Sequence, residues 1–324
     1  MTYAGFRLSF TYLCRRYRQT PPIKFKEDLS ELMVGVKRSC TEAAQHGEAN
    51  LWDGDRPLTW GLYKQFNEWF LQEGTEEGLF AAAFSKMTCV LACRGKSTGQ
   101  VLMQHLLWAD DYLEVPFGHM KDAQTGDNAI KKLPCSMYCN PLDHSCCVLV
   151  GIFDYLALNP HLLRNPNDPL FAGSVASQSQ RFGRYVKQIC LKYEQEILKK
   201  FGFKISDIGV HSWRKCAHTK LNCGSTAGPT AAAACIRGGH SMGSNRDVYI
   251  AHEKASDHYC GRILAGLPEH KPEFAVSYTD FIAINDLASL SEGVASTQVE
   301  HCQLVLDEMV DRVLDSIFGV KNLQ

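Results

Sequence analysis

"LFAAAFSKMTCVLAC", residues 79–93, is almost wholly apolar and ends directly before Arg94. The run is too short to cross a bilayer, which takes about 20 residues. Apolar residues on every side of a helix are typical of a helix at the centre of a folded domain. We therefore expect 79–93 to be a buried helix. An unpaired guanidinium is costly beside such a helix, so Arg94 is a candidate functional residue.

The segments around this helix predict a mainly α chain with a small antiparallel β-sheet, an α+β class. Helices are expected at 3–19, after Pro21-Pro22, from 58 and near 147, and again at 178–201. A short sheet is expected around "DYLEVPF" and the turn at 122–128. The predicted parts are a short helical segment (1–50), a linker (51–57), a main domain (58–270) and an acidic helical extension (271–324).

Charge is distributed unevenly along a chain whose net charge is only -1. Residues 181–220 and 1–40 are strongly basic, whereas 271–324 is acidic. Basic blocks can be solvated helix faces or surfaces that face phosphates, and both interpretations stay open. In the acidic part, 297–318 is an amphipathic helix that packs on its own domain or on a neighbouring subunit.

The composition favours a soluble, intracellular protein. No run of eighteen apolar residues and no signal peptide is evident, and the 14 cysteines are scattered as in reduced proteins. "RGKST" (94–98) lacks the first glycine of a phosphate loop, because Val90 stands there. "CSMYCNPLDHSCC" (135–147) resembles no common zinc pattern. A Cys/His metal protein is therefore the weakest interpretation.

One ordered set of residues carries a more specific signal. Arg94 is followed by Lys121, by His211 and Arg214 in "HSWRKCAHT", and by "GGHSMGSNRDVY" (238–249). The last stretch places a histidine, His240, nine residues before a tyrosine, Tyr249.

This order resembles that of the tyrosine recombinase (phage integrase) family over roughly 57–267. Phrases such as "VPFGHMKDAQTG" and "GRILAGLP" are most similar to the eukaryotic branch of Crypton-like mobile elements. The chain departs from the family at Ser97, where an acidic residue is common, and at Lys215, where histidine is common. The resemblance implies a tyrosine recombinase catalytic fold at 58–270 and a partial DNA-clamp (core-binding) domain at 1–50.

The resemblance also implies a role for each residue. Arg94 and Arg214 would stabilise the charge on a DNA phosphate during attack. Tyr249 would be the nucleophile, with His211 as candidate base. His240 would hydrogen-bond the phosphate, and Lys121 would protonate the leaving 5′ oxygen.

The implied activity is DNA strand cleavage and rejoining through a 3′-phosphotyrosyl intermediate. It requires no metal and no cofactor, and it takes double-stranded DNA, with no membrane and no small-molecule substrate. Self-association as a dimer or tetramer on DNA is expected, and so is a nuclear location in a eukaryotic host. The alternative is a catalytically inactive, recombinase-derived DNA-binding protein. Tyr259 in "SDHYCGR" is the rival nucleophile.

Overall fold

The computed structural model describes residues 3–46, 54–109, 111–116, 134–240 and 254–268. Contacts divide the chain into two compact units, Met1–Gly54 and Asp55–Gln324. The boundary falls inside the linker that the sequence predicts. Within the described ranges, no helix is long and apolar enough to cross a membrane.

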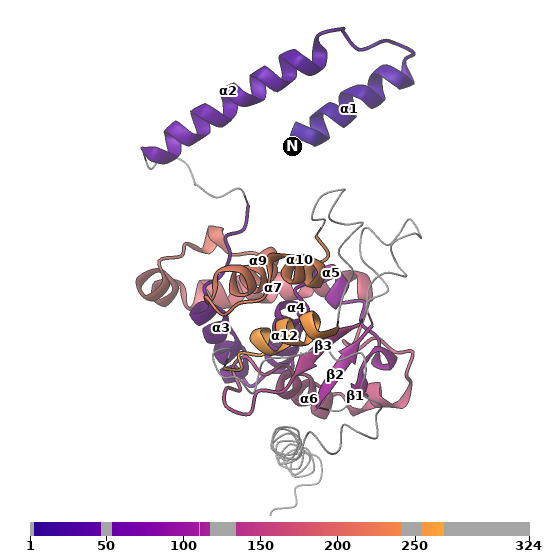
Figure 1. Ribbon diagram of the computed structural model, residues 1–324, viewed down its shortest axis with the longest axis vertical. Helices are drawn as coiled ribbons and strands as arrows, with labels where there is room; N and C mark the ends of the chain where they lie inside the picture. The colour runs from indigo at the N-terminus through magenta and orange to yellow at the C-terminus, as the bar shows by residue number, and fades with distance from the viewer. Residues whose placement is uncertain (1–2, 47–53, 110, 117–133, 241–253, 269–324) are drawn as a thin grey trace, which may run out of the picture. The chain divides into compact units, whose positions relative to one another are not determined.

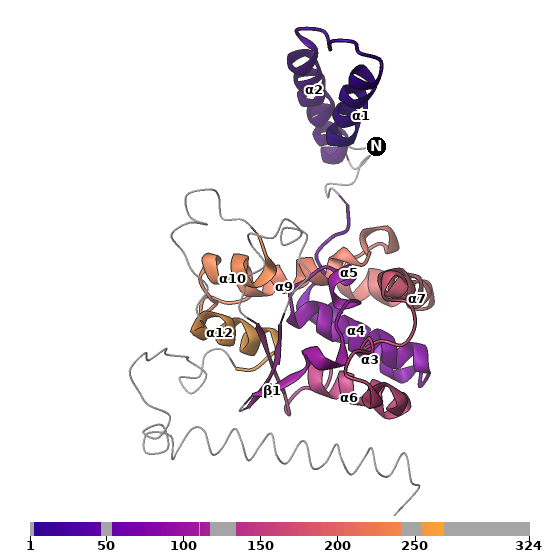
Figure 2. The same ribbon diagram turned by 90° about the vertical axis from the view of Figure 1, so that its right-hand side faces the viewer.

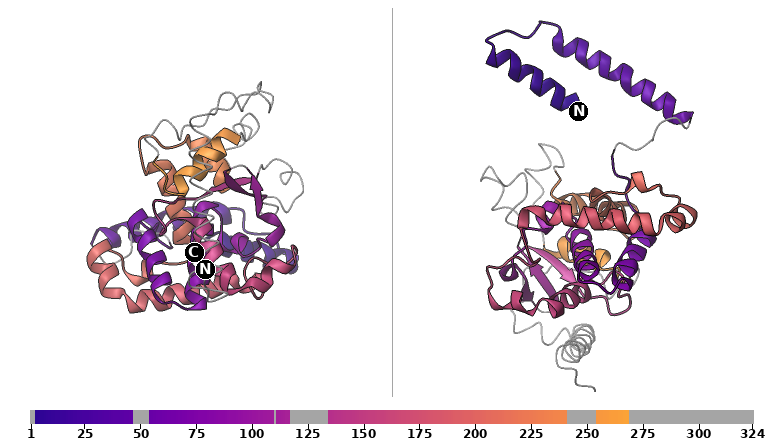
Figure 3. Two further views of the ribbon diagram at one scale, coloured as in Figure 1. Left: turned by 90° about the horizontal axis from the view of Figure 1, so that it is seen from below. Right: turned by 180° about the vertical axis from the view of Figure 1, so that it is seen from behind.

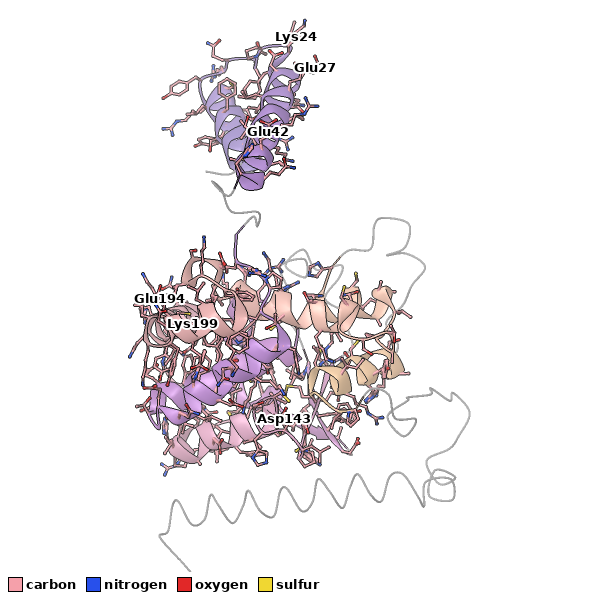
Figure 4. The ribbon with its side chains drawn as sticks, turned by 90° about the vertical axis from the view of Figure 1, so that its left-hand side faces the viewer. Lys24, Glu27, Glu42, Asp143, Glu194 and Lys199 are labelled. Atoms are coloured by element: carbon pink, nitrogen blue, oxygen red, sulfur yellow. The ribbon has the colours of Figure 1, made fainter. Side chains whose placement is uncertain are left out.

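The first unit is a helical hairpin of α1 (Tyr3–Arg16) and α2 (Phe25–Gln45). The Phe10 and Phe25 rings stack at 4.2 Å between centroids where the helices meet. Figure 4 shows Lys24 and Glu27 near the turn and Glu42 towards the other end of α2. Among its described side chains only one apolar residue, Leu29, is buried, so this hairpin encloses almost no core of its own.

The second unit is built around α4 (Glu76–Val90), which is buried from Phe80 to Val90. Thr75 caps its first turn by accepting a hydrogen bond from Gly78 N, and two glutamates favour that positive helix end. The buried helix expected at 79–93 is thereby confirmed, except that it both begins and ends a few residues earlier.

The other helices and strands of this unit surround α4 (Figures 1 and 2). The helices are α3 (Trp60–Gln72), α5 (Gly95–Thr98), α6 (Val148–Leu158), α7 (Gln178–Lys192), α8 (Glu194–Glu196), α9 (His211–Cys223), α10 (Ala231–Gly238) and α12 (Lys254–Leu264). The strands are β1 (Leu107–Ala109), β2 (Tyr112–Val115) and β3 (Cys135–Tyr138). In Figure 1, α5, α9 and α10 lie on one side of the unit, and the strands and α6 lie on the other.

A buried polar chain joins the helices that meet in the core. Trp213 Nε1 donates to Ser85 Oγ at 2.7 Å, and Ser85 Oγ lies 2.5 Å from Asn67 Oδ1. Asn67 in turn donates to the Ser145 carbonyl at 2.8 Å. Because these side chains are buried, each hydrogen bond avoids an unmet polar group in the core. This series of hydrogen bonds therefore fixes α3 and α9 against α4.

The three strands form an antiparallel sheet in the order β1-β2-β3. Trp108 pairs with Leu113, and Leu113 pairs with Met137. Helix α12 packs on β3 so closely that a side chain at Gly261 would collide with the Ser136 carbonyl oxygen. Over the described ranges the protein is therefore mainly helical with a small antiparallel sheet, as the sequence predicts. The turn expected at 122–128 lies outside these ranges.

A buried ion pair closes the fold between α10 and α12. Arg237 NH1 lies 2.5 Å from Asp257 Oδ1, and both side chains are almost inaccessible to solvent. Arg237 NH2 also donates to the carbonyls of Val90 and Ser136, each at 2.8 Å. The other carboxylate oxygen of Asp257 accepts from the Ser136 amide and hydroxyl. One guanidinium thus connects α10, α12, β3 and the end of α4.

Candidate functional site

Arg94 lies in the turn that follows α4. Ala92 adopts a left-handed backbone conformation, with φ of 47°, which reverses the chain after the helix. Thr98 holds the turn closed, because its hydroxyl lies 2.9 Å from the Thr88 hydroxyl and 3.1 Å from Cys93 Sγ. Arg94 then precedes α5 and is partly exposed. Among the residues that the structure describes, its guanidinium forms neither an ion pair nor a hydrogen bond.

Arg214 is 7% exposed and projects from α9. Its NH2 donates to the Gly238 carbonyl at 2.7 Å and lies 2.6 Å from Nε2 of His240. A guanidinium can only donate, so this contact assigns Nε2 of His240 as the acceptor and places the proton on Nδ1. Helix α9 and the segment after α10 are therefore in contact through Arg214 and His240. These are two of the residues that the resemblance would place on the phosphate.

The start of α9 is fixed by a residue from the beginning of the unit. Oδ2 of Asp55 accepts a hydrogen bond from His211 N at 3.1 Å, where a carboxylate is favoured by the helix dipole. Lys215 Nζ donates to the Asp55 carbonyl. Lys215, at the position where the family often has histidine, therefore binds the backbone at Asp55, within the predicted linker. The His211 imidazole itself is exposed.

Arg94 lies beside α9, because its two chain neighbours contact that region. A Cβ on Gly95 would lie 2.8 Å from Cγ1 of Val210, the residue before His211. On the other side, burial raises the pKa of the Cys93 thiol to about 11, and the positive charge of Arg214 opposes that rise. The turn after α4 and the first turns of α9 thus bring Arg94, His211 and Arg214 to one region.

The structure therefore gathers four of the six candidate residues: Arg94, His211, Arg214 and His240. Lys121 and Tyr249 lie outside the described residues. So does the turn between His240 and Tyr249.

The two glycines before His240 each have a separate physical reason. Gly239 ends α10 in the left-handed conformation, with φ of 68°, and this reversal lets His240 N donate to the Cys235 carbonyl at 2.8 Å. Gly238 has no room for a side chain, because a Cβ there would overlap the imidazole of His218. The chain can return towards Arg214 only if both positions stay small.

We expect Gly238→Ala to destabilise the second unit by about 1–3 kcal/mol, the usual range for overpacking, because the His218 ring, which packs against His240, would have to shift. Chemical denaturation measures the loss. Gly35→Ala is the matched control, since a Cβ added at Gly35 on α2 would meet nothing within 4 Å and the substitution adds helix propensity. Equal stability of the Gly238→Ala protein and the unaltered protein would contradict the close approach.

His218 is a residue of this site that sequence reasoning missed. Its ring lies 4.5 Å from the His240 ring, between centroids, in an edge-on arrangement. Burial, the neighbouring His240 and the Arg214 charge lower the pKa of His218 to about 4, so the imidazole is neutral at pH 7. Its spacing of four residues from Arg214 was the available signal, because residues i and i+4 share one helix face.

Tyr259, the rival nucleophile, has a structural contact. It is partly buried against the core, and its hydroxyl donates to the carbonyl of Ala227 in the segment between α9 and α10. This hydrogen bond favours a structural role for the Tyr259 hydroxyl over a role as nucleophile.

The two motifs set aside from the sequence also have structural explanations. "RGKST" consists of Arg94 and the short helix α5, and the segment before it is the buried helix α4, whereas a phosphate loop needs a strand there. In the cysteine-rich segment, Cys139 Sγ lies 3.7 Å from Cys147 Sγ. Hydrogen bonding from Cys139 lowers the pKa of Cys147 to about 6. Across the described ranges, no cluster of three or more His, Cys, Asp or Glu could hold a metal ion.

Some basic residues of the block at 181–220 form ion pairs, whereas others are exposed on its surface. Arg181 NH2 lies 2.7 Å from Glu77, and Lys192 Nζ lies 2.5 Å from Glu73. Arg184 lies on the exposed side of α7, the helix that crosses the unit in the right-hand view of Figure 3. Arg181 and Lys192 already have carboxylate partners, so they are weaker candidates for phosphate contacts than Arg184.

No family model, no curated protein and no solved structure matches this chain.

Proposed function

We propose that this protein is a tyrosine recombinase that cleaves and rejoins DNA strands through a covalent phosphotyrosyl intermediate. The observation that carries the proposal is the contact of Arg214 with His240, in a region where the two chain neighbours of Arg94 lie close to Val210 and to the Arg214 charge. These residues come from three separate segments, and the resemblance to the family names each of them independently of their position in space.

The proposed site has a suitable charge distribution for a phosphodiester. Two guanidiniums can share the non-bridging oxygens, and both are charged at any physiological pH. Arg94 forms no ion pair or hydrogen bond within the described ranges, so no carboxylate there needs to be displaced. Arg214 is held rigid by the Gly238 carbonyl, which limits the reorganisation needed when the phosphate arrives.

In the proposed reaction, the Tyr249 hydroxyl loses its proton to His211 and its oxygen attacks the phosphorus atom. The bond from phosphorus to the 5′ oxygen breaks, and Lys121 donates a proton to that oxygen. The resulting 3′-phosphotyrosyl link conserves the energy of the broken phosphodiester bond. A second 5′-hydroxyl can therefore attack this link and reverse the step on another strand. Several copies of the chain would assemble on the DNA as a dimer or tetramer.

Covalent capture tests the proposal. The protein is incubated with nicked double-stranded DNA from its genomic flanks, so that the cleaved fragment diffuses away, and a denaturing gel shows whether an adduct forms. DNA binding with no adduct would favour the inactive DNA-binding alternative. No binding and no adduct would contradict both.

We expect the adduct yield to be unchanged by a chelator, because cationic side chains provide the charge stabilisation that a metal ion provides in metal-dependent nucleases. The measurement compares adduct formation in EDTA and in magnesium. Activity that is lost in EDTA and restored by magnesium would rule out the proposed chemistry.

A further inference from the structure

Cys139 and Cys147 bring two free thiols into contact where the chain passes from β3 to α6. Cys139 directly follows β3, and Cys147 is the residue before the first turn of α6. Their Sγ atoms lie 3.7 Å apart, and neither cysteine is in a disulfide. Both belong to the cysteine-rich segment at 135–147, to which the proposed function gives no role.

The backbone around Cys147 favours a negative charge on its sulfur. The amide N–H of Asn140 donates a hydrogen bond to this sulfur at 3.3 Å. Cys147 is also the N-cap residue of α6, a helix of 11 residues. The N-terminus of a helix carries a partial positive charge, which stabilises a thiolate relative to a thiol.

The buried side chain of Lys86 brings a positive charge to the same place. Its Nζ donates to the His144 carbonyl at 2.9 Å, and its stem packs on α6, since a Cβ added at Gly151 would lie 2.8 Å from Lys86 Cδ. A buried cation is costly without a counter-charge, and a thiolate at Cys147 would provide one. Hydrogen bonding from Cys139, together with backbone donors and the Lys86 charge, lowers the pKa of Cys147 to about 6 although burial opposes this.

The other buried cysteines nearby have a different environment. The Sγ atom of Cys146, the preceding residue, faces the carbonyl oxygens of Asp143 and Ala265. Carbonyl oxygens only accept hydrogen bonds, so they cannot stabilise an anion. Burial raises the pKa of Cys146 to about 12, and it does the same for Cys190 on α7. An oxidant should therefore distinguish between two neighbouring thiols of one segment.

We propose that Cys139 and Cys147 form a reversible disulfide when the protein meets hydrogen peroxide. The Cys147 sulfur attacks one peroxide oxygen, the O–O bond breaks, and the hydroxide that leaves takes up a proton, which gives a sulfenic acid and water. The Cys139 sulfur then attacks the sulfenic sulfur, its proton joins the departing hydroxyl, and a second water leaves. Two thiols are oxidised to a disulfide while one peroxide is reduced to two waters.

The pair can close with a small movement. The sulfurs must approach from 3.7 Å to the disulfide length of about 2 Å. Cys147 is fully buried, whereas Cys139 is 6% exposed, so a molecule nearly as small as water can reach the pair at its edge. The disulfide would join β3, on which α12 packs, directly to the start of α6. This inference does not rest on the proposed function.

Peptide mapping tests the proposal on the unaltered chain. The protein is treated with equimolar hydrogen peroxide, its remaining thiols are alkylated in denaturant, and the chain is cut before Asp143, which separates the two cysteines. We expect a disulfide that joins Cys139 to Cys147 and that dithiothreitol reverses. A disulfide to Cys146 instead, or a Cys147 that is oxidised no faster than Cys190, would overturn the proposal.

Single substitutions separate the two roles. In the Cys139→Ser protein the serine hydroxyl can still donate to Cys147 but cannot form a disulfide, so the sulfenic acid should persist and react with dimedone. In the Cys147→Ser protein, peroxide should leave Cys139 reduced. Cys190→Ser is the matched control, because Cys190 is also buried and the disulfide should form as before. A Cys147 that stays reduced in the Cys139→Ser protein would contradict the proposal.

The pH dependence of the reaction gives an independent readout. The thiolate is the nucleophile, so the rate of Cys147 oxidation should rise as pH increases through about 6 and level off near neutral pH. We expect the rate at pH 6 to be about half of its plateau, whereas an ordinary thiol with a pKa of about 8.5 would still be almost unreactive there. A rate that continues to rise tenfold per pH unit up to pH 8 would overturn the proposal.

Discussion

Tyr249→Phe is expected to abolish covalent capture of nicked DNA while leaving folding and DNA binding intact. The change removes the only atom that can attack phosphorus and keeps the aromatic ring. A phenylalanine cannot form a phosphoester, so the adduct should fall below detection. The measurement is a denaturing gel with end-labelled DNA, followed by peptide mapping of any adduct.

Tyr259→Phe is the matched control. It removes the hydroxyl that donates to the Ala227 carbonyl. It should lower stability by about 1 kcal/mol, the usual net value of a hydrogen bond, and leave covalent capture in place. An adduct that persists in the Tyr249→Phe protein, or that maps to Tyr259, would overturn the assignment of the nucleophile.

Asp257→Asn should cause the largest loss of stability among the substitutions considered. The change leaves the buried guanidinium of Arg237 without its counter-charge, and breaking such a pair costs about 3–5 kcal/mol. Urea unfolding of the two proteins measures the difference. The surface pair of Lys192 and Glu73 provides the control, because solvent screens the exposed Lys192 and Glu73→Gln should therefore change stability far less than Asp257→Asn does.

The same ion pair predicts how stability depends on pH. Burial acts to raise the pKa of Asp257, but the Arg237 charge and the Ser136 hydrogen bonds lower it below its usual value overall. The unfolded chain therefore binds a proton at a higher pH than the folded protein does. The stabilisation is complete above the unfolded pKa of about 3.9 and is lost as pH falls through the lower folded value. An Asp257→Asn protein should show less of this acid loss; an unchanged acid profile would contradict the role of the pair.

The pattern of neighbouring residues was sufficient to predict the helices of the core and the shared helix of one pair of site residues. A run that is almost wholly apolar, as in 79–93, is most stable when it is buried, and α4 is buried for that reason. The i, i+3 spacing of His211 and Arg214 places them on consecutive turns of α9. Both inferences need only the period of a helix, which is a property of neighbouring residues.

The sequence could not show which side chains those two residues meet. Arg214 is buried against Gly238 and His240, while His211 is exposed, because neighbouring segments cover only one of the two. The buried pair of Arg237 and Asp257 has no sequence signal, since the two residues stand on different helices and meet only when α10 and α12 pack together. The sequence also does not show that two basic residues of α7, Arg181 and Lys192, form ion pairs with carboxylates of Glu77 and Glu73.

By itself the sequence determined the class of the fold, the buried helix and the order of the candidate residues, because these follow from periodicity and residue type along the chain. Only the tertiary structure decided that Arg94 lies beside α9, that Arg214 binds His240, and that the His218 ring packs against His240. Those contacts join residues far apart in the chain. They arise when several helices pack around one core, and packing depends on the shapes of all of them together.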